Sequence, residues 1–206
     1  MPSKTPKAKP SPAERAPKRA AQRIRETASD LFYRQGIRAV GVDEIVTRAG
    51  VTKPSLYRSF PSKDELAAAY LRDYGDDFFR RFDAVAAAHP GDPRGQILAW
   101  LGGSAERARK SHYRGCGLTN AAVEYPEHDH PARRAAETNK RAVRARLTEL
   151  ARAMGAADPQ ALGDGLMLLM EGIYATGQLF ESGGPATSVV DAAERLIASH
   201  VKSRST

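Results

Sequence analysis

The sequence predicts an all-α protein with a small three-helix domain at its N-terminus and a larger helical domain behind it. Apolar residues recur at helical spacing along most of the 206 residues, and Ile24, Ala28, Leu31 and Phe32 form the first such stripe. No segment has the sustained period-2 alternation of a half-buried strand. Hydrophobic residues make up 41% of the chain and charged residues 27%, as in ordinary globular proteins.

Glycine, proline and small polar residues divide the first part of the chain into four predicted helices, at residues 20–35, 43–49, 52–60 and 62–88. Gly36 is placed to end the first helix, and Gly50 stands where a positive φ would end the second. Thr52 is a candidate cap of the third helix. Ser62 and Glu65 have the spacing of a capping box at the start of the long fourth helix.

The rest of the chain predicts five more helices, near residues 94–112, 118–124, 132–154, 158–180 and 188–201. Asp158 followed by Pro159 is typical of a capped helix start. The helix after it is apolar on more than one face, which indicates burial on two sides. His128, Asp129 and His130 lie between two prolines and predict a capped turn; their spacing suits no standard structural metal site.

All of the excess positive charge lies in the N-terminal third. Residues 1–72 carry 15 lysines and arginines against 7 acidic residues, whereas residues 73–206 carry 17 of each. This asymmetry predicts a polyanion-binding N-terminal region joined to a neutral body. We interpret residues 1–18 as a flexible basic tail that lacks apolar side chains to bury. A single cysteine, Cys116, excludes an intramolecular disulfide and, with no apolar run long enough for a membrane span, predicts a cytoplasmic protein.

The segment from Val51 to Leu66, VTKPSLYRSFPSKDEL, predicts the second half of a helix-turn-helix. A short recognition helix that stands clear of the body can enter a DNA major groove, while the preceding helix braces it across the backbone. The expected roles follow from position. Thr52, Lys53 and Ser55 would meet base edges, Tyr57 and Arg58 would reach phosphates or bases, and Lys63 would meet a phosphate. Two alternatives are that Tyr57 is a packed core aromatic and that Ser55 only starts the helix.

From about Arg19 to Tyr74 the chain resembles the TetR family of transcriptional regulators, through D-E-I, A-G-V, a recognition helix that runs from small polar residues to Tyr, and F-x-S-K-D-E-L. The resemblance implies that Gly41, Val42 and Asp43 start the bracing helix and belong to the DNA-binding set. It implies the domains 1–18 (tail), 19–66 (helix-turn-helix) and 67–206 (ligand sensing and dimerisation). It also implies a homodimer on a palindromic operator, released by a small-molecule effector.

Two features of the C-terminal body are candidate parts of the sensor. The last two helices could form a four-helix bundle with a second copy; the alternative is one large monomeric core. An effector pocket could be lined by Phe78, Phe82, Trp100, Tyr113, Met167 and Tyr174, although aromatic and Met residues at helical spacing are more often plain core. The basic residues between Arg133 and Arg146 predict a solvated helix face, with an anionic ligand site as the alternative.

Cys116 is the second candidate sensor. It lies at a helix start, two residues after Arg114, and both features favour a thiolate. Asn120 and Glu124 follow at intervals of four, and the segment is similar to a G-C-x-x-x-N-x-x-x-E pattern of some TetR-like regulators. The hypothesis is a redox or electrophile switch; the alternative is a small residue that packs a tight helix start.

The function predicted from the sequence is therefore a repressor that leaves its operator when a ligand or modification of Cys116 reshapes the body. It is not expected to be an enzyme, and no cofactor or metal is expected. Two other functions compete. One is a thiol enzyme that uses Cys116 with His112, His128 or His130. The other is a protein that coats DNA without sequence preference through its basic tail.

Overall fold

The computed structural model describes residues 12–180 and 184–201, with side chains from residue 19 onward, and every regular element in these ranges is helical. The chain divides into two compact units, one up to Tyr70 and one from Leu71. Helix α4 (Lys63–Ala87) runs through the division. The predicted all-α class with a smaller N-terminal and a larger C-terminal helical part is confirmed.

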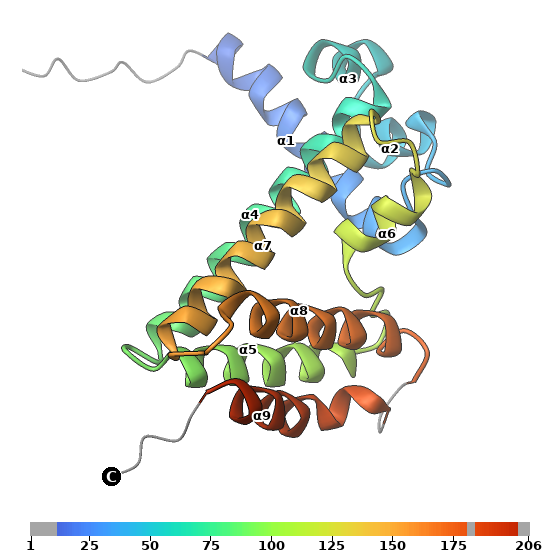
Figure 1. Cartoon of the computed structure of the whole chain (residues 1–206). Coiled ribbons are helices and arrows are strands. Elements are labelled where there is room, and N and C mark those ends of the chain that lie inside the picture. The colour runs from blue at the N-terminus through green and yellow to red at the C-terminus, as the bar shows by residue number, and fades with distance from the viewer. Residues whose placement is uncertain (1–11, 181–183, 202–206) are drawn as a thin grey trace, which may run out of the picture. The chain divides into compact units, whose positions relative to one another are not determined.

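The first unit holds α1 (Pro12–Gln35), α2 (Val42–Ala49), α3 (Lys53–Ser59) and the first two turns of α4. In Figure 1, α1 and α2 are blue and α3 is blue-green. Gly36 (φ 92°) ends α1 and Gly50 (φ 61°) ends α2, as predicted from their sequence positions. The core consists of side chains that are almost fully buried: Ile24, Ala28, Leu31, Phe32, Ile37, Val40, Ile45, Leu56, Leu66 and Tyr70.

Helix α1 begins at Pro12, eight residues before the predicted start at residue 20. Residues 12–18 of the predicted tail are helical, while residues 1–11 lie outside the described residues. The apolar side chains of Val51 and Phe60 are only half-buried.

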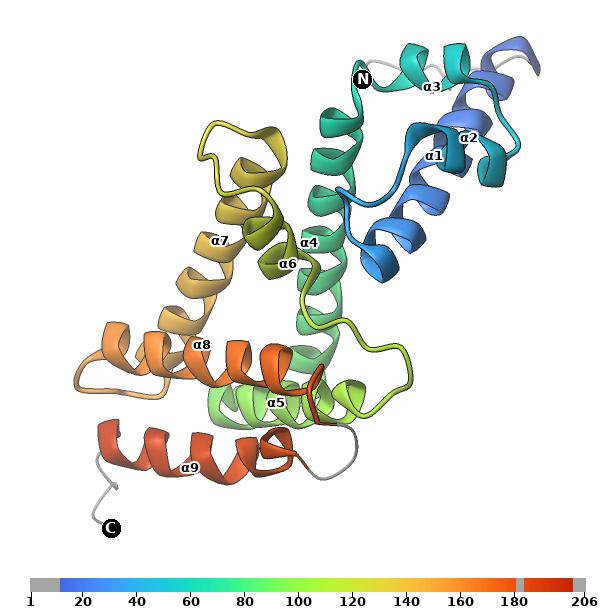
Figure 2. The ribbon, with the colours of Figure 1, turned by 90° about the vertical axis from the view of Figure 1, so that its right-hand side faces the viewer.

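The second unit continues α4 and adds α5 (Pro93–Ala108), α6 (Gly117–Glu124), α7 (Pro131–Ala153), α8 (Pro159–Thr176), the 3₁₀ turn η1 (Pro185–Ser188) and α9 (Val189–His200). Helices α5, α8 and α9 pack against one another, and Figures 1 and 2 show them side by side. Helix α7 packs on α8, and α6 packs on α7. Apolar side chains from these helices, among them Trp100, Leu101, Leu147, Leu166, Ile173 and Ile197, form the core.

Two predicted helix ends were wrong. Helix α5 ends at Ala108 instead of near His112, which adopts a left-handed φ of 64°. Helix α8 ends at Thr176 instead of Phe180, with Gly177 as its C-cap. A Cβ at Gly177 would come within 2.7 Å of Ala108 Cβ, so glycine permits the close approach of the ends of α5 and α8. In the described ranges, no helix combines the length and the apolar character that crossing a lipid bilayer requires.

Candidate functional site

Helices α2 and α3 form the predicted helix-turn-helix, and local backbone bonds fix the turn between them. Gly50 adopts a left-handed conformation, and its N–H donates to the Thr47 carbonyl at 3.2 Å. The next N–H, of Val51, donates to the Val46 carbonyl at 3.0 Å. Leu56 on α3 is fully buried against the rest of the unit. The opposite side of α3 is therefore left to solvent.

The predicted DNA-contacting residues lie mainly on this exposed surface. Tyr57 is 48% exposed, so it is not a core aromatic as the alternative held. Ser55 is half-buried, and its carbonyl accepts a hydrogen bond from the Ser59 hydroxyl at 3.2 Å. The remaining members are exposed or half-buried: Gly41, Val42, Asp43, Thr52, Lys53, Arg58 and Lys63.

Lys53, the first residue of α3, forms an ion pair that the sequence did not reveal. Its ammonium lies 2.8 Å from a carboxylate oxygen of Asp43 in the first turn of α2. The hydrogen bond to Asp43 raises the pKa of the Lys53 side chain. Both side chains are exposed, at 51% and 80%. The pair joins the two helices of the motif at their N-terminal ends, where Lys53 would meet DNA.

The start of α4 supplies a second polar group at this surface. The Ser62 hydroxyl accepts the Glu65 N–H at 3.1 Å, which confirms one half of the predicted capping box. Lys63 donates to the carbonyl of Arg38 at 3.3 Å. Its ammonium is thus held next to the chain segment that leads into α2.

In the second unit, three of the predicted pocket residues form one aromatic cluster. Trp100 on α5 lies with ring centroids 4.9 Å from Phe78 and 5.1 Å from Phe82, both on α4. All three are almost fully buried. The indole N–H of Trp100 is buried and has no hydrogen-bond acceptor among the described residues.

Arg107, which the sequence did not single out, lies beside this aromatic cluster. Its guanidinium lies 4.9 Å from the centre of the Trp100 ring and donates to the Ser104 hydroxyl at 2.7 Å. Burial lowers the pKa of the Arg107 guanidinium, and repulsion by Arg81 adds to the effect. The pKa of Arg107 is raised, against these two effects, by three nearby tyrosines: Tyr74, Tyr113 and Tyr174.

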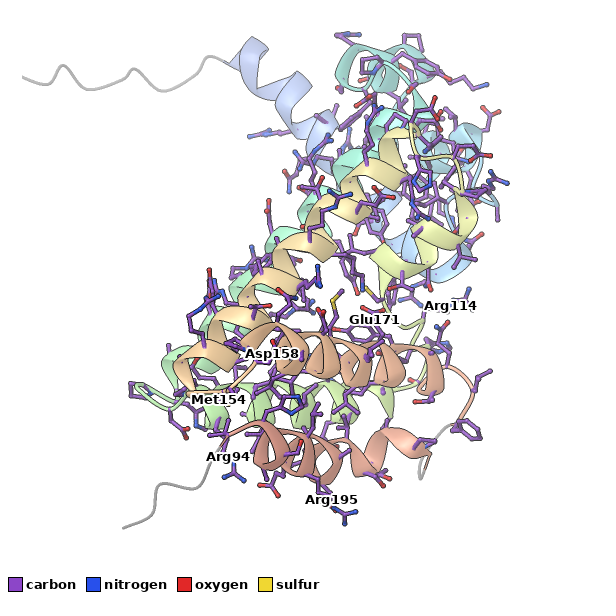
Figure 3. The ribbon with its side chains drawn as sticks, viewed as in Figure 1. Arg94, Arg114, Met154, Asp158, Glu171 and Arg195 are labelled. Carbon is purple, nitrogen blue, oxygen red and sulfur yellow. The ribbon has the colours of Figure 1, made fainter. Side chains whose placement is uncertain are left out.

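Tyr174 on α8 lies near enough to Arg107 to influence its pKa. Burial raises the pKa of the Tyr174 hydroxyl, and the nearby Cys116 adds to the shift. The Lys140 ammonium lies 5.3 Å from the centre of the Tyr174 ring and pairs with Glu171. Glu171 also accepts the Thr119 hydroxyl at 2.8 Å, which matches its position in Figure 3 on the side of α8 that faces α6 and α7.

The structure therefore brings Tyr113, Cys116 and Tyr174 into one neighbourhood. Cys116 is the N-cap residue of α6 and is 3% exposed, so its thiol is not open to solvent. The Asn120 amide donates to the carbonyl of Arg114 at 2.7 Å, which fastens the loop before the cysteine. Tyr113 and Met167 are half-buried.

The segment from His128 to His130 is a capped turn, as predicted. His130 is the N-cap of α7: its Nδ1 accepts the Ala132 N–H at 3.2 Å, and its ring stacks on Tyr125. His128 Nδ1 lies 3.1 Å from a carboxylate oxygen of Glu137. The described residues contain no group of three or more potential ligands arranged for a metal ion.

The basic face of α7 is largely neutralised within the unit. Arg144 binds both oxygens of Asp164, at 2.6 and 2.7 Å, and Arg146 lies 2.9 Å from Asp83. Other ion pairs on this face join Glu137 to Arg133 and Arg141, and Glu171 to Lys140. This face is therefore not an open anion site.

Comparison with known proteins places these features in context. Residues 24–70 match the family described as "Bacterial regulatory proteins, tetR family". Among characterised relatives, a 105-residue segment is 31% identical to the HTH-type transcriptional repressor KstR2 of Rhodococcus jostii and covers half of each chain. A 50-residue segment is 50% identical to the HTH-type transcriptional activator FasR of Mycolicibacterium smegmatis, covering 24% of this chain and 23% of that protein. The matches thus span about a quarter to a half of these relatives.

Solved structures match over nearly the whole chain. SCO4454, a TetR-family transcriptional regulator from Streptomyces coelicolor, is 31% identical with a TM-score of 0.81, over 90% of this chain and 97% of the other. The reduced form of NemR from E. coli has a TM-score of 0.74 over 90% of this chain and 100% of its own, but at 18% identity it shares the fold alone.

Proposed function

This chain belongs to the TetR family of bacterial transcriptional regulators, and on that premise we propose that it is a homodimeric repressor that leaves a palindromic operator when a small molecule binds its second unit. The observation that carries the proposal is the exposed polar surface of α3, with Thr52, Lys53 and Tyr57 at the solvent side of a helix whose Leu56 is fully buried. Such a helix can enter a major groove without unfolding the core. The place of action would be the cytoplasm, where the operator is.

The DNA-binding set is Gly41, Val42, Asp43, Thr52, Lys53, Ser55, Tyr57, Arg58 and Lys63. In this proposal Thr52 and Ser55 read base edges, whereas Arg58 and Lys63 hold phosphates. The N–H groups at the start of α4 add a further phosphate contact.

The second copy would bind on α8 and α9. Leu168 on α8 is 74% exposed and Leu179 beyond it is 77% exposed, while Gly172 and Ala175 lie exposed between them. Large apolar side chains in such a row are costly to leave in water, and a two-fold partner would cover them. A dimer would also supply the two recognition helices that a palindrome requires.

The dimer has a direct test with a matched control. Leu168→Glu should shift the protein from dimer to monomer in sedimentation velocity and weaken operator binding. Val123→Glu, at an equally exposed apolar position on α6 (79%), should leave the dimer intact. A dimeric Leu168→Glu protein would place the interface elsewhere.

The repressor function is tested by titrating the protein against genomic fragments that flank its own gene, with random DNA as competitor, at physiological salt. Selective retention of a palindromic fragment supports a specific regulator. Deletion of residues 1–18 distinguishes a specific regulator from a protein that coats DNA without sequence preference. A specific regulator keeps its operator preference after the deletion, with weaker overall binding. Uniform retention that disappears with the deletion would refute the proposal.

Modification of Cys116 is a second route to release. The buried thiol lies near Tyr174, so an adduct there would disturb the packing of α6 against α7 and α8. Cys116→Ser should then abolish operator release by electrophiles such as N-ethylmaleimide. Unchanged release by every reagent tested would remove this route and leave ligand binding alone.

A further inference from the structure

We propose that the effector of the second unit is an organic carboxylate, whose charged group binds Arg107 and the indole N–H of Trp100 and whose apolar body lies against the Phe78 and Trp100 rings. The inference deepens the proposed function, because it assigns a chemical class to the ligand of that site. Four observations carry it.

The first observation is the unpartnered indole N–H. Trp100 is 1% exposed, and its Nε1 has neither a protein acceptor among the described residues nor access to solvent. A buried donor without an acceptor is costly, so such a group in a native protein calls for an explanation. An acceptor atom of a bound molecule provides one.

The second observation is the lack of a counter-charge at Arg107. Among the described residues Arg107 forms no ion pair with a carboxylate, and burial and repulsion by the like charge of Arg81 lower its pKa. In contrast, Arg133, Arg144 and Arg146 in the same unit each have a carboxylate partner. A half-buried cation beside another cation favours the binding of an anion.

The third observation is that the two groups are held on one face of α5. Trp100, Ser104 and Arg107 lie at i, i+4 and i+7, and a chain of hydrogen bonds joins them. The Ser104 hydroxyl donates to the Trp100 carbonyl at 2.8 Å and accepts from Arg107 at 2.7 Å. This link orients the guanidinium over the indole and uses one of its five N–H donors, so the others remain for a carboxylate.

The fourth observation is the surrounding of apolar and phenolic groups. Phe78 and Phe82 are buried against Trp100, and Tyr174 is close enough to Arg107 to act on its charge. Ring faces of this kind suit the apolar part of a ligand. The site thus offers a cation, a buried N–H donor and an apolar wall, which together match an amphipathic acid.

Trp100 is the only tryptophan of the chain, so its fluorescence reports ligand binding at the site itself. We would titrate the full chain, without DNA, with phenylacetate, 4-phenylbutyrate, cyclohexanecarboxylate and decanoate, each beside its neutral amide. Because a hydrogen bond to a charged group contributes about 1.5–3 kcal/mol, at least one acid should bind about 10- to 100-fold more tightly than its amide. Equal affinity of every acid and its amide, or no binding by any acid at millimolar concentration, would overturn the proposal.

A variant pair localises the charge. Arg107→Met should remove the preference for the acid over the amide, and Arg109→Met should retain it, since Arg109 is exposed and pairs with Glu106 at 3.4 Å. Circular dichroism checks that both variants are folded. If Arg107→Met does not fold, the comparison of acids and amides on the natural chain still decides. A preference that survives in folded Arg107→Met would refute the assignment.

The same ligands are then added to the operator complex. If acids bind with charge preference but do not release DNA, the ligand class stands and the proposed coupling to the operator fails. If acids and amides release DNA equally, the coupling stands and the ligand class fails.

Discussion

The ion pair between Lys53 and Asp43 leads to a counterintuitive prediction: Asp43→Asn should tighten DNA binding. The Lys53 ammonium is held 2.8 Å from the Asp43 carboxylate, so contact with DNA requires this pair to open or to be shared. Because both side chains are at least half exposed, the pair is weak. We expect affinity for operator and random DNA to rise by about two- to fivefold. The gain is small because breaking an exposed ion pair costs little free energy and because the repulsion between the Asp43 carboxylate and DNA is screened by solvent.

The assay is fluorescence anisotropy with a labelled duplex over a series of salt concentrations. Asp43→Asn should steepen the dependence of log K on log salt by up to about one unit, because Lys53 then releases a full counterion. Asp77→Asn is the matched control: Asp77 lies in the second unit in an exposed pair with Arg80. Weaker binding of Asp43→Asn at every salt concentration would refute the reasoning and make Asp43 the residue that positions Lys53.

Three further predictions concern stability. Gly50→Ala places a side chain at φ 61° and should cost about 1 kcal/mol, seen as a lower melting temperature; an unchanged melting temperature would contradict the turn. A Cβ at Gly163 would lie 2.9 Å from the Thr148 backbone, so Gly163→Ala should cost about 1–3 kcal/mol in urea unfolding, and a neutral result would mean that α7 and α8 pack less closely. Hydrogen bonding to Arg144 lowers the pKa of Asp164 to about 2, so the stabilisation from this carboxylate is present above its unfolded pKa and is lost as the pH falls from about 4 to 2. The difference in urea midpoint between the natural chain and Asp164→Asn should disappear over that pH range. A difference that stays constant with pH would show that the ion pair of Asp164 with Arg144 is not its cause.

Most of the fold could be predicted from the sequence because its signals are local. The caps illustrate this: Asp158 accepts the N–H groups of Gln160 and Ala161 at 3.1 and 3.0 Å, as its place before Pro159 predicts. The errors arise where tertiary packing overrides the pattern. Apolar residues continue to Phe180, but α8 ends at Thr176, and Gly177 directly after it approaches Ala108 of α5 closely.

The start of α1 was missed for a different reason. Residues 12–18 lack apolar side chains, which suggested a tail, but alanine and charged residues are good helix formers and proline is well suited to a first helical position. The helix therefore begins before the first residue of the apolar stripe. Periodicity predicts the buried face of a helix and says little about where the helix begins.

The sites were predicted less completely than the fold. Exposure of α3 follows from local pattern, but the pairing of Lys53 with Asp43 depends on how two helices meet. Arg107 gave no signal in a neutral, arginine-rich body, because what distinguishes it is the absence of a nearby carboxylate together with burial. Such a property depends on the three-dimensional arrangement, and no spacing of residues in the sequence predicts it.

The pairing of charges in the first unit also bears on how it would distinguish an operator from other DNA. Arg34, Arg48 and Lys53 each lie within 2.9 Å of a carboxylate, so a part of the positive charge in the N-terminal third is balanced before DNA binds. A phosphate that displaces such a carboxylate gains less than one that meets an unpaired cation. The number of basic residues therefore overstates the nonspecific attraction. With that attraction reduced, the base contacts proposed for the start of α3 would contribute a larger share of the binding free energy, which would favour discrimination between DNA sequences.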